Sequence, residues 1–161
     1  MLLAETILSI DYGQVLVHLE GHPAPERLWT DAHVAQGFAW SEGAVSFGIP
    51  DHDGLCRLRV THADAALLDP QALWALQVPF EVSGPLELGT LFQTERLAVP
   101  HGTHALVFAA LPGAGGAGAD EEEAYLLQLV FVRDDAPTFR ILKQGGDLTT
   151  DEILCTGSEQ A

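Results

Sequence analysis

Two short motifs in this sequence contain residue types that bind metal ions. In "HGTH", His101 and His104 flank a turn, and two imidazoles in this arrangement can share a cation. "PDHDG" begins like a calcium loop, but His62 stands where such a loop has its closing Glu. Solvated turn histidines and a hairpin turn at Asp53 and Gly54 explain both motifs without a metal. We therefore predict no metal site and no cofactor, and keep a small-ligand or divalent-metal-binding β-sandwich module as the alternative.

Side chains for covalent or acid–base catalysis are not grouped in a known pattern. The sequence has no G-x-S-x-G motif and no glycine-rich phosphate loop between a strand and a helix. Neither Cys56 nor Cys155 lies in a pattern that activates a thiol. Pairs of acids are so frequent in this chain that their proximity carries no information about catalysis. We predict a protein that is not an enzyme.

The strongest signal in the composition is charge. Seven Lys and Arg residues stand against 23 Asp and Glu residues, which gives a formal net charge of -16 at pH 7. The few cations are scattered singly, whereas nucleic-acid binding needs clustered ones, so we exclude nucleic acid as a direct ligand. A basic protein partner is the natural complement of such a field. The alternative is that acidity only keeps a chain with 47% hydrophobic residues soluble.

The elements that would position these residues are mainly short strands. Hydrophobic and polar residues alternate in three segments, which predicts half-buried antiparallel strands. These segments are residues 12–19, 55–61 and 78–82. Pro79 indicates a sheet edge or a strand start, while residues 104–111 and 125–132 are apolar on both faces, as in central strands. With turn residues between these runs, the sequence predicts an all-β fold, an antiparallel β-sandwich.

One short helix is expected near the first two tryptophans. Thr30 is placed to cap its first turn, and Gly37 to end it in a left-handed conformation. Trp29 before the cap and Val34 after it have the spacing of a hydrophobic staple. A turn and a strand at residues 44–48 follow. We expect this helix at one end of the sandwich.

The chain is expected to form one β-sandwich domain over residues 1–145, followed by a loosely attached acidic C-terminal tail over residues 146–161. A glycine-rich flexible loop at residues 112–123 ends in an acidic run. The sequence has no basic leading segment and no run of about 18 apolar residues, which predicts a cytoplasmic protein without a membrane span. Both cysteines are expected to be free thiols. A homo-oligomer is compatible with the sequence.

Two groups of residues are candidates for contact with a partner. Trp40 beside Glu42 combines an aromatic ring with a carboxylate, as interface anchors often do. Acids also stand at both ends of the apolar run 125–132, and they are Asp120, Glu121, Glu122, Glu123, Asp134 and Asp135. Carboxylates spaced along a surface can imitate the phosphates of nucleic acid and occupy a cationic cleft. The alternatives are core packing for Trp40 and solvated loops for the acids.

Three stretches of the sequence resemble one known family over roughly Ile7 to Val132. They are "WTDAHVAQGFAWSEGAVSFG", "VPFEVSGPLELGTLFQTERLAVPHGTHALVFAALPG" and "AYLLQLVFV", in this order. Their Trp-Thr-Asp start, the glycine that closes the helix, the Glu-Gly-Ala turn and the "VPHG" turn are similar to the competence protein J family. The "PGAGGAGADEEE" insertion and the acidic extension after Arg133 depart from that family.

The resemblance implies a small acidic protein that binds and inactivates a NucA-like DNase of bacterial DNA uptake. The same relation joins immunity proteins to toxins that carry this nuclease domain. The expected partner is therefore a basic or metal-dependent DNase, and the inhibitor would protect the DNA of the producing cell. The resemblance assigns no individual contact residue.

Overall fold

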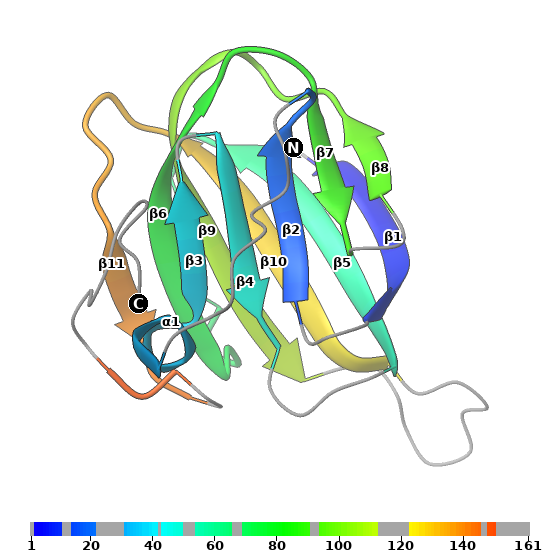
Figure 1. Cartoon of the computed structure of the whole chain (residues 1–161), viewed down its shortest axis with the longest axis vertical. Helices are drawn as coiled ribbons and strands as arrows, with labels where there is room; N and C mark the ends of the chain where they lie inside the picture. Colours follow the sequence, from blue (N-terminus) through cyan, green and yellow to red (C-terminus); the bar gives the residue numbers. More distant parts are fainter. Residues whose placement is uncertain are drawn as a thin grey trace.

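The protein is a sandwich of two β-sheets, shown as a computed structural model in Figure 1. The structure describes residues 2–10, 14–21, 31–41, 43–49, 54–65, 69–90, 94–112, 123–145 and 148–150. The strands are β1 (Leu2–Ile10), β2 (Gln14–Leu19), β3 (Phe38–Ser41), β4 (Ala44–Gly48), β5 (Gly54–Ala63), β6 (Trp74–Val82), β7 (Leu86–Gly89), β8 (Thr94–Leu97), β9 (Gly102–Pro112), β10 (Glu123–Arg133) and β11 (Arg140–Lys143), and the helix is α1 (Asp31–Gln36). The predicted all-β fold is confirmed.

The larger sheet, sheet A, has the strand order β1-β5-β10-β9-β6-β11. Its neighbours are antiparallel except for β5 and β10, which are parallel. The predicted antiparallel β-sandwich is confirmed, and this pair is its one parallel contact among the described strand pairs. The chain leaves β5, forms β6 to β9, and returns in β10 beside β9, so that β10 runs in the same direction as β5.

The smaller sheet, sheet B, has the order β3-β4-β2-β7-β8 and is antiparallel throughout. Its central strand β2 was predicted to be half-buried, with Gln14 and His18 on an exposed face. Instead Leu16 and His18 are buried as completely as the strand's other face. This part of the prediction is wrong, because β2 is buried on both faces at the centre of sheet B, between β4 and β7.

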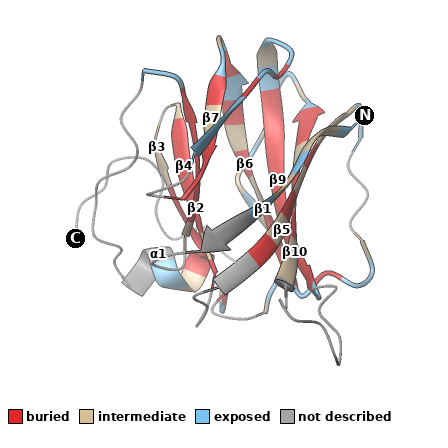
Figure 2. Cartoon of the chain, turned by 90° about the vertical axis from the view of Figure 1, so that its right-hand side faces the viewer, coloured by how far each residue is buried: buried red, intermediate tan, exposed pale blue. Residues whose placement is uncertain are grey.

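The core lies between the sheets, where the inward-facing residues of both layers meet (Figure 2). Phe47 of β4 stacks on Phe108 of β9 with ring centroids 4.5 Å apart and planes inclined by 4°. The predicted alternation of residues 78–82 is confirmed, because Val78, Phe80 and Val82 are buried while Glu81 is exposed. Burial of these apolar side chains is the main force that holds the two sheets together.

Helix α1 begins at Asp31 and ends before Gly37, as the sequence predicts. Gly37 has φ 83°, a left-handed conformation that glycine adopts without strain and that stops the helix. Trp29 and Thr30 lie outside the described residues. Val34, the expected partner of Trp29 in the staple, is 44% exposed. No helix among the described residues is long and apolar enough to cross a membrane.

The chain remains attached to the sandwich beyond residue 145. Leu148 is only 3% exposed and belongs to the main core, and the Thr149 amide donates to the Ala35 carbonyl oxygen at 2.9 Å. A bridge between Gly145 and Leu148 shapes this segment. An apolar side chain within the predicted tail, at position 148, therefore fills a place in the core. Residues 151–161 of the predicted tail lie outside the described residues.

Candidate functional site

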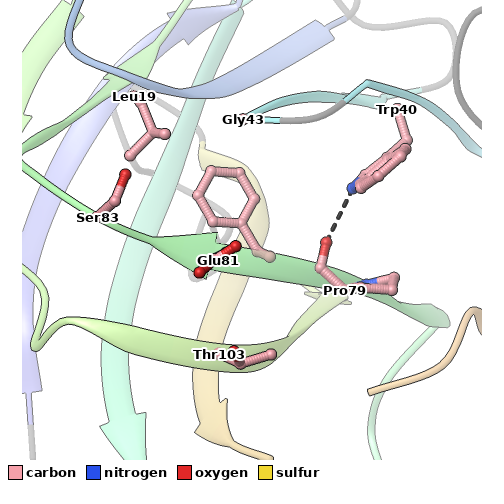
Figure 3. A pocket seen from close by; sticks show the side chains of 8 residues that line it. Leu19, Trp40, Gly43, Pro79, Glu81, Ser83 and Thr103 are labelled. Atoms are coloured by element: carbon pink, nitrogen blue, oxygen red, sulfur yellow. Dashed lines mark hydrogen bonds between the residues drawn. The ribbon is translucent and has the colours of Figure 1, made fainter. Parts of the chain in front are cut away.

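A groove of about 510 Å³ opens where β3 of sheet B passes over β6 of sheet A (Figure 3). Sheet B and its β3–β4 turn contribute three of its lining residues: Leu19, Trp40 and Gly43. Sheet A and its loops contribute the other five: Pro79, Phe80, Glu81, Ser83 and Thr103. We call this site the β3–β6 groove. It is lined by both sheets, so the packing of the sandwich sets its width.

Trp40 forms one wall of the groove and is fixed in place by two contacts. Its indole Nε1–H donates to the Pro79 carbonyl oxygen at 2.8 Å (Figure 3), and its ring meets the edge of Phe139 at a centroid distance of 5.2 Å. The side chain is half-buried against the core. Trp40 therefore connects the two sheets and still lines the groove with part of its surface.

The floor of the groove is a stretch of β6 that has no outer neighbour strand among the described residues. Strand β11 pairs with β6 only from Ala75 to Gln77. Pro79 has no N–H to donate, and its carbonyl faces Trp40 rather than a strand. Proline is tolerated at this position because no ladder hydrogen bond is lost there. The sequence prediction that Pro79 marks a sheet edge is confirmed for this part of β6.

Acidic residues stand at one side of the groove. Glu81 pairs with Thr103 in the β6–β9 register, and the Asp134 amide donates to the Thr103 carbonyl oxygen at 3.2 Å. Glu81 and Asp134 therefore flank Thr103 on neighbouring strands, with their Cα atoms about 10 Å apart. Asp134 Oδ1 accepts a hydrogen bond from the Ala136 amide at 2.9 Å, which orients the carboxylate.

The predicted contact residues fall into two separate groups. Trp40 lines the groove, and Asp134 and the exposed Asp135 lie beside it. Glu123 begins β10, whose 11 residues span about 33 Å, so it lies at the opposite end of the sandwich from Asp134. Glu42, Asp120, Glu121 and Glu122 lie outside the described residues.

The two histidines of "HGTH" are not brought together. His101 is exposed, whereas His104 is fully buried and points its Nε2 at Nε2 of His62, 3.2 Å away. The other ring nitrogen, Nδ1, donates to the Gly102 carbonyl oxygen at 2.9 Å. Side chains alternate between the two faces of an extended chain, and residues 101 and 104 are an odd number of positions apart. The two imidazoles therefore point in opposite directions.

These histidines give no support to the ligand-binding alternative. Burial lowers the pKa of His104, the carbonyl of Gly102 opposes this shift, and the charges of His62 and Arg133 add to it. The described residues contain no group of three or more His, Cys, Asp or Glu that could hold a metal ion. Asp51 to Asp53 of "PDHDG" lie outside the described part of the chain.

Sequence reasoning did not select Glu81, Ser83 or Thr103 as site residues. The alternation of "VPFEV" places Glu81 on the outer face, which is a usable signal, but it does not show which face borders a groove. Thr103 joins the site only through pairing of β9 with β6 and the contact with Asp134. Such pairings between distant segments leave no local pattern.

Comparison with known proteins agrees with this architecture. The chain is similar to the crystal structure of ComJ, inhibitor of the DNA degrading activity of NucA, from Bacillus subtilis: the TM-score is 0.60 at 22% sequence identity, over 82% of this chain and 98% of that chain. A second structure, described as crocagin biosynthetic gene J, has a TM-score of 0.46 at 15% identity, over 79% of this chain and 97% of that chain. None of the curated protein sequences matches the chain.

The sequence itself matches the family described as Competence protein J (ComJ) over residues 7–132. This range runs from β1 to the end of β10 and includes α1 and both sheets. It also contains every residue that lines the β3–β6 groove. Since the match extends over most of the chain, this protein belongs to the competence protein J family.

Proposed function

We propose that this protein inhibits a NucA-like DNase by binding it and covering its cationic active site. The observation that carries the proposal is membership of the competence protein J family. The Bacillus subtilis protein of similar structure is an inhibitor of the DNA degrading activity of NucA. On this proposal the chain acts as a binding protein and not as an enzyme.

The charge of the chain supports the same function. A DNase must attract phosphate, and a protein of net charge -16 is drawn to the same cationic surface. Two of its few cations share one carboxylate: Arg59 and Arg57 donate to Glu5 at 2.8 and 2.9 Å. The hydrogen bond from Arg59 is the main reason that the pKa of Glu5 is lowered.

Charge alone does not make a durable complex. Complementary fields mainly accelerate association and select the partner, while a few desolvated anchors supply most of the binding energy. A standard interface buries about 1,600 Å² in total, far more than one side chain covers. We therefore expect rapid, salt-dependent association together with an apolar contact that resists salt. We propose a cytoplasmic site of action, where the inhibitor would protect the cell's own DNA.

The test is a DNA-degradation assay with the NucA-like DNase encoded nearest to this chain. The purified protein is titrated into a fixed amount of nuclease at low and at physiological salt. We expect cleavage to stop near an equimolar ratio at low salt and to need more inhibitor as salt rises. An unchanged cleavage rate at equimolar protein and low salt contradicts the proposal.

Two controls separate specific inhibition from a general effect of negative charge. Polyglutamate at the same carboxylate concentration tests whether acidity alone suppresses cleavage. A DNase of unrelated fold tests whether the protein instead binds the DNA or removes metal ions from the buffer. The proposal requires that polyglutamate inhibits far less and that the unrelated DNase keeps its full activity.

A further inference from the structure

The β3–β6 groove borders a strand edge with unused hydrogen-bonding capacity. Successive residues of a strand direct their N–H and C=O groups to opposite sides. The Pro79 carbonyl faces Trp40, away from β9, so the backbone of Glu81, two residues further on, faces the same side. On the side of β6 opposite β9, the described part of the chain places no strand beyond Gln77. An unpaired edge of this kind is a template for a strand from another chain.

The same groove offers apolar contacts beside this edge. Leu19 and Trp40 extend from sheet B above the groove, and Pro79 lies below them (Figure 3). Its volume of about 510 Å³ lies within the range of sites that enclose a few side chains or a small ligand. Trp40 is held by its hydrogen bond to Pro79, so its ring is fixed before a partner arrives. A fixed aromatic wall costs little conformational entropy when a partner binds.

The charge around the groove specifies what can enter. None of the eight lining residues is basic, and Glu81 is exposed at the free edge. Asp134 adds a second carboxylate beside Thr103. A segment entering along β6 would carry its alternate side chains past these acids, where Lys or Arg is favoured and Asp or Glu is repelled.

From these observations we infer that the β3–β6 groove is the partner-binding surface: an extended, basic segment of the nuclease pairs with the free edge of β6 at Glu81. A Lys or Arg side chain of that segment meets the carboxylate of Glu81, and Asp134, on the far side of Thr103, adds to the negative potential. The wall of Trp40 and the neighbouring apolar residues enclose the segment. This inference rests on the proposed function, because it names the surface through which the inhibitor acts.

The experiment compares a charge reversal at Glu81 with the same charge reversal at a control position on the far edge of sheet B. Glu81→Lys reverses the charge in the groove, and Glu95→Lys makes the same change on exposed β8, the strand farthest from β3 in its sheet. We expect Glu81→Lys to raise the half-inhibitory concentration about tenfold or more and Glu95→Lys to change it about twofold or less. Equal effects of the two variants overturn the inference while the inhibitory function stands.

Backbone pairing is tested at the same position. Glu81→Ala removes only the carboxylate, whereas Glu81→Pro also removes the N–H that would bond to the partner strand. Pro79 shows that this edge accepts proline. We expect Glu81→Pro to inhibit several-fold less well than Glu81→Ala, with urea unfolding of each variant measured alongside. Equal inhibition by these two variants contradicts strand pairing.

A measurement on the unmodified protein keeps the inference testable if a variant fails to fold. Hydrogen exchange of the wild-type protein, alone and saturated with the nuclease, reports protection of the amides of residues 80–83, that of Glu81 above all. Slower exchange there in the complex supports the inference, and unchanged exchange in an inhibited complex overturns it. If the wild-type protein does not inhibit the nuclease at all, the proposed function fails and the inference falls with it.

Discussion

Nε2 of His62 lies 3.2 Å from Nε2 of His104, with the two rings nearly perpendicular at 76°. Because a carbonyl oxygen only accepts, the contact with Gly102 places a hydrogen on Nδ1 of His104. In the neutral ring, Nε2 of His104 is then an acceptor, and His62 donates to it. This hydrogen bond between the two Nε2 atoms exists only while His104 stays uncharged, because protonated His104 has no acceptor nitrogen.

This arrangement predicts a loss of stability in mild acid. The pKa of His104 is lowered from 6.5 in the folded state, so between 6.5 and that lower value the unfolded chain binds a proton that the folded chain does not. Neutral, buried His104 therefore makes its full contribution to the free energy of unfolding above pH 6.5, and this contribution decreases as the pH falls. We expect the free-energy difference between wild type and His104→Leu to shrink from about pH 7.5 to about pH 5.5, measured by urea unfolding.

A histidine in the same motif provides the control. His101 is exposed, so His101→Gln removes an imidazole without touching the buried pair. Its free-energy difference from wild type should stay constant over the same pH range. The explanation is wrong if the His104→Leu difference also stays constant, because general charge repulsion would then account for the whole pH dependence of this acidic protein.

Trp40→Phe should destabilise the protein by about 1–2 kcal/mol, because a smaller aromatic ring replaces the indole and the Pro79 carbonyl loses its donor. Ser41→Ala is a suitable control on the same strand, since the Ser41 hydroxyl is 3.5 Å from the Ala44 carbonyl oxygen, a long and weak contact. Chemical denaturation of both variants measures the difference. Equal stability of the two variants would show that the indole hydrogen bond contributes nothing.

Gly37→Ala should destabilise the protein more than Gly21→Ala. Both glycines have positive φ, 83° and 88°, so alanine is strained by about 1 kcal/mol at either position. A Cβ at Gly37 would also lie 3.2 Å from Leu76 Cδ2, whereas nothing lies within 4 Å of a Cβ at Gly21. The excess cost of Gly37→Ala in thermal or urea unfolding therefore measures crowding against Leu76. A larger cost at Gly21 would contradict this assignment.

The features that could be predicted from the sequence are those fixed by local patterns. Burial of Val78, Phe80 and Val82 follows from alternation, because β6 has one face toward the core and one toward solvent. The end of α1 at Gly37 follows from a backbone conformation that glycine adopts most easily. Each of these features depends on a few consecutive residues.

The features that could not be predicted depend on contacts between distant segments. Both faces of β2 are buried in the centre of sheet B, so alternation within residues 12–19 is misleading. The groove exists because Trp40 contacts Pro79, which is 39 positions further along the chain. Pro79 lies past Gln77, the last residue of β6 that pairs with β11. Charge and aromatic content selected Trp40 and Asp134, but only the pairing of β6, β9 and β10 brings Glu81 into the same site.

The stacked pair of Phe47 and Phe108 predicts the largest effect of a single substitution on stability. Both rings are fully buried, and they join β4 of one sheet to β9 of the other at a centroid distance of 4.5 Å. Phe108→Ala should lower the free energy of unfolding by about 3–5 kcal/mol, because a large cavity replaces the ring between the sheets. Leu73→Ala, at a position 39% exposed, removes apolar atoms at the surface and should cost about 1 kcal/mol or less. Urea unfolding measures both, and similar losses for the two variants would mean that the sheets are held together elsewhere in the core.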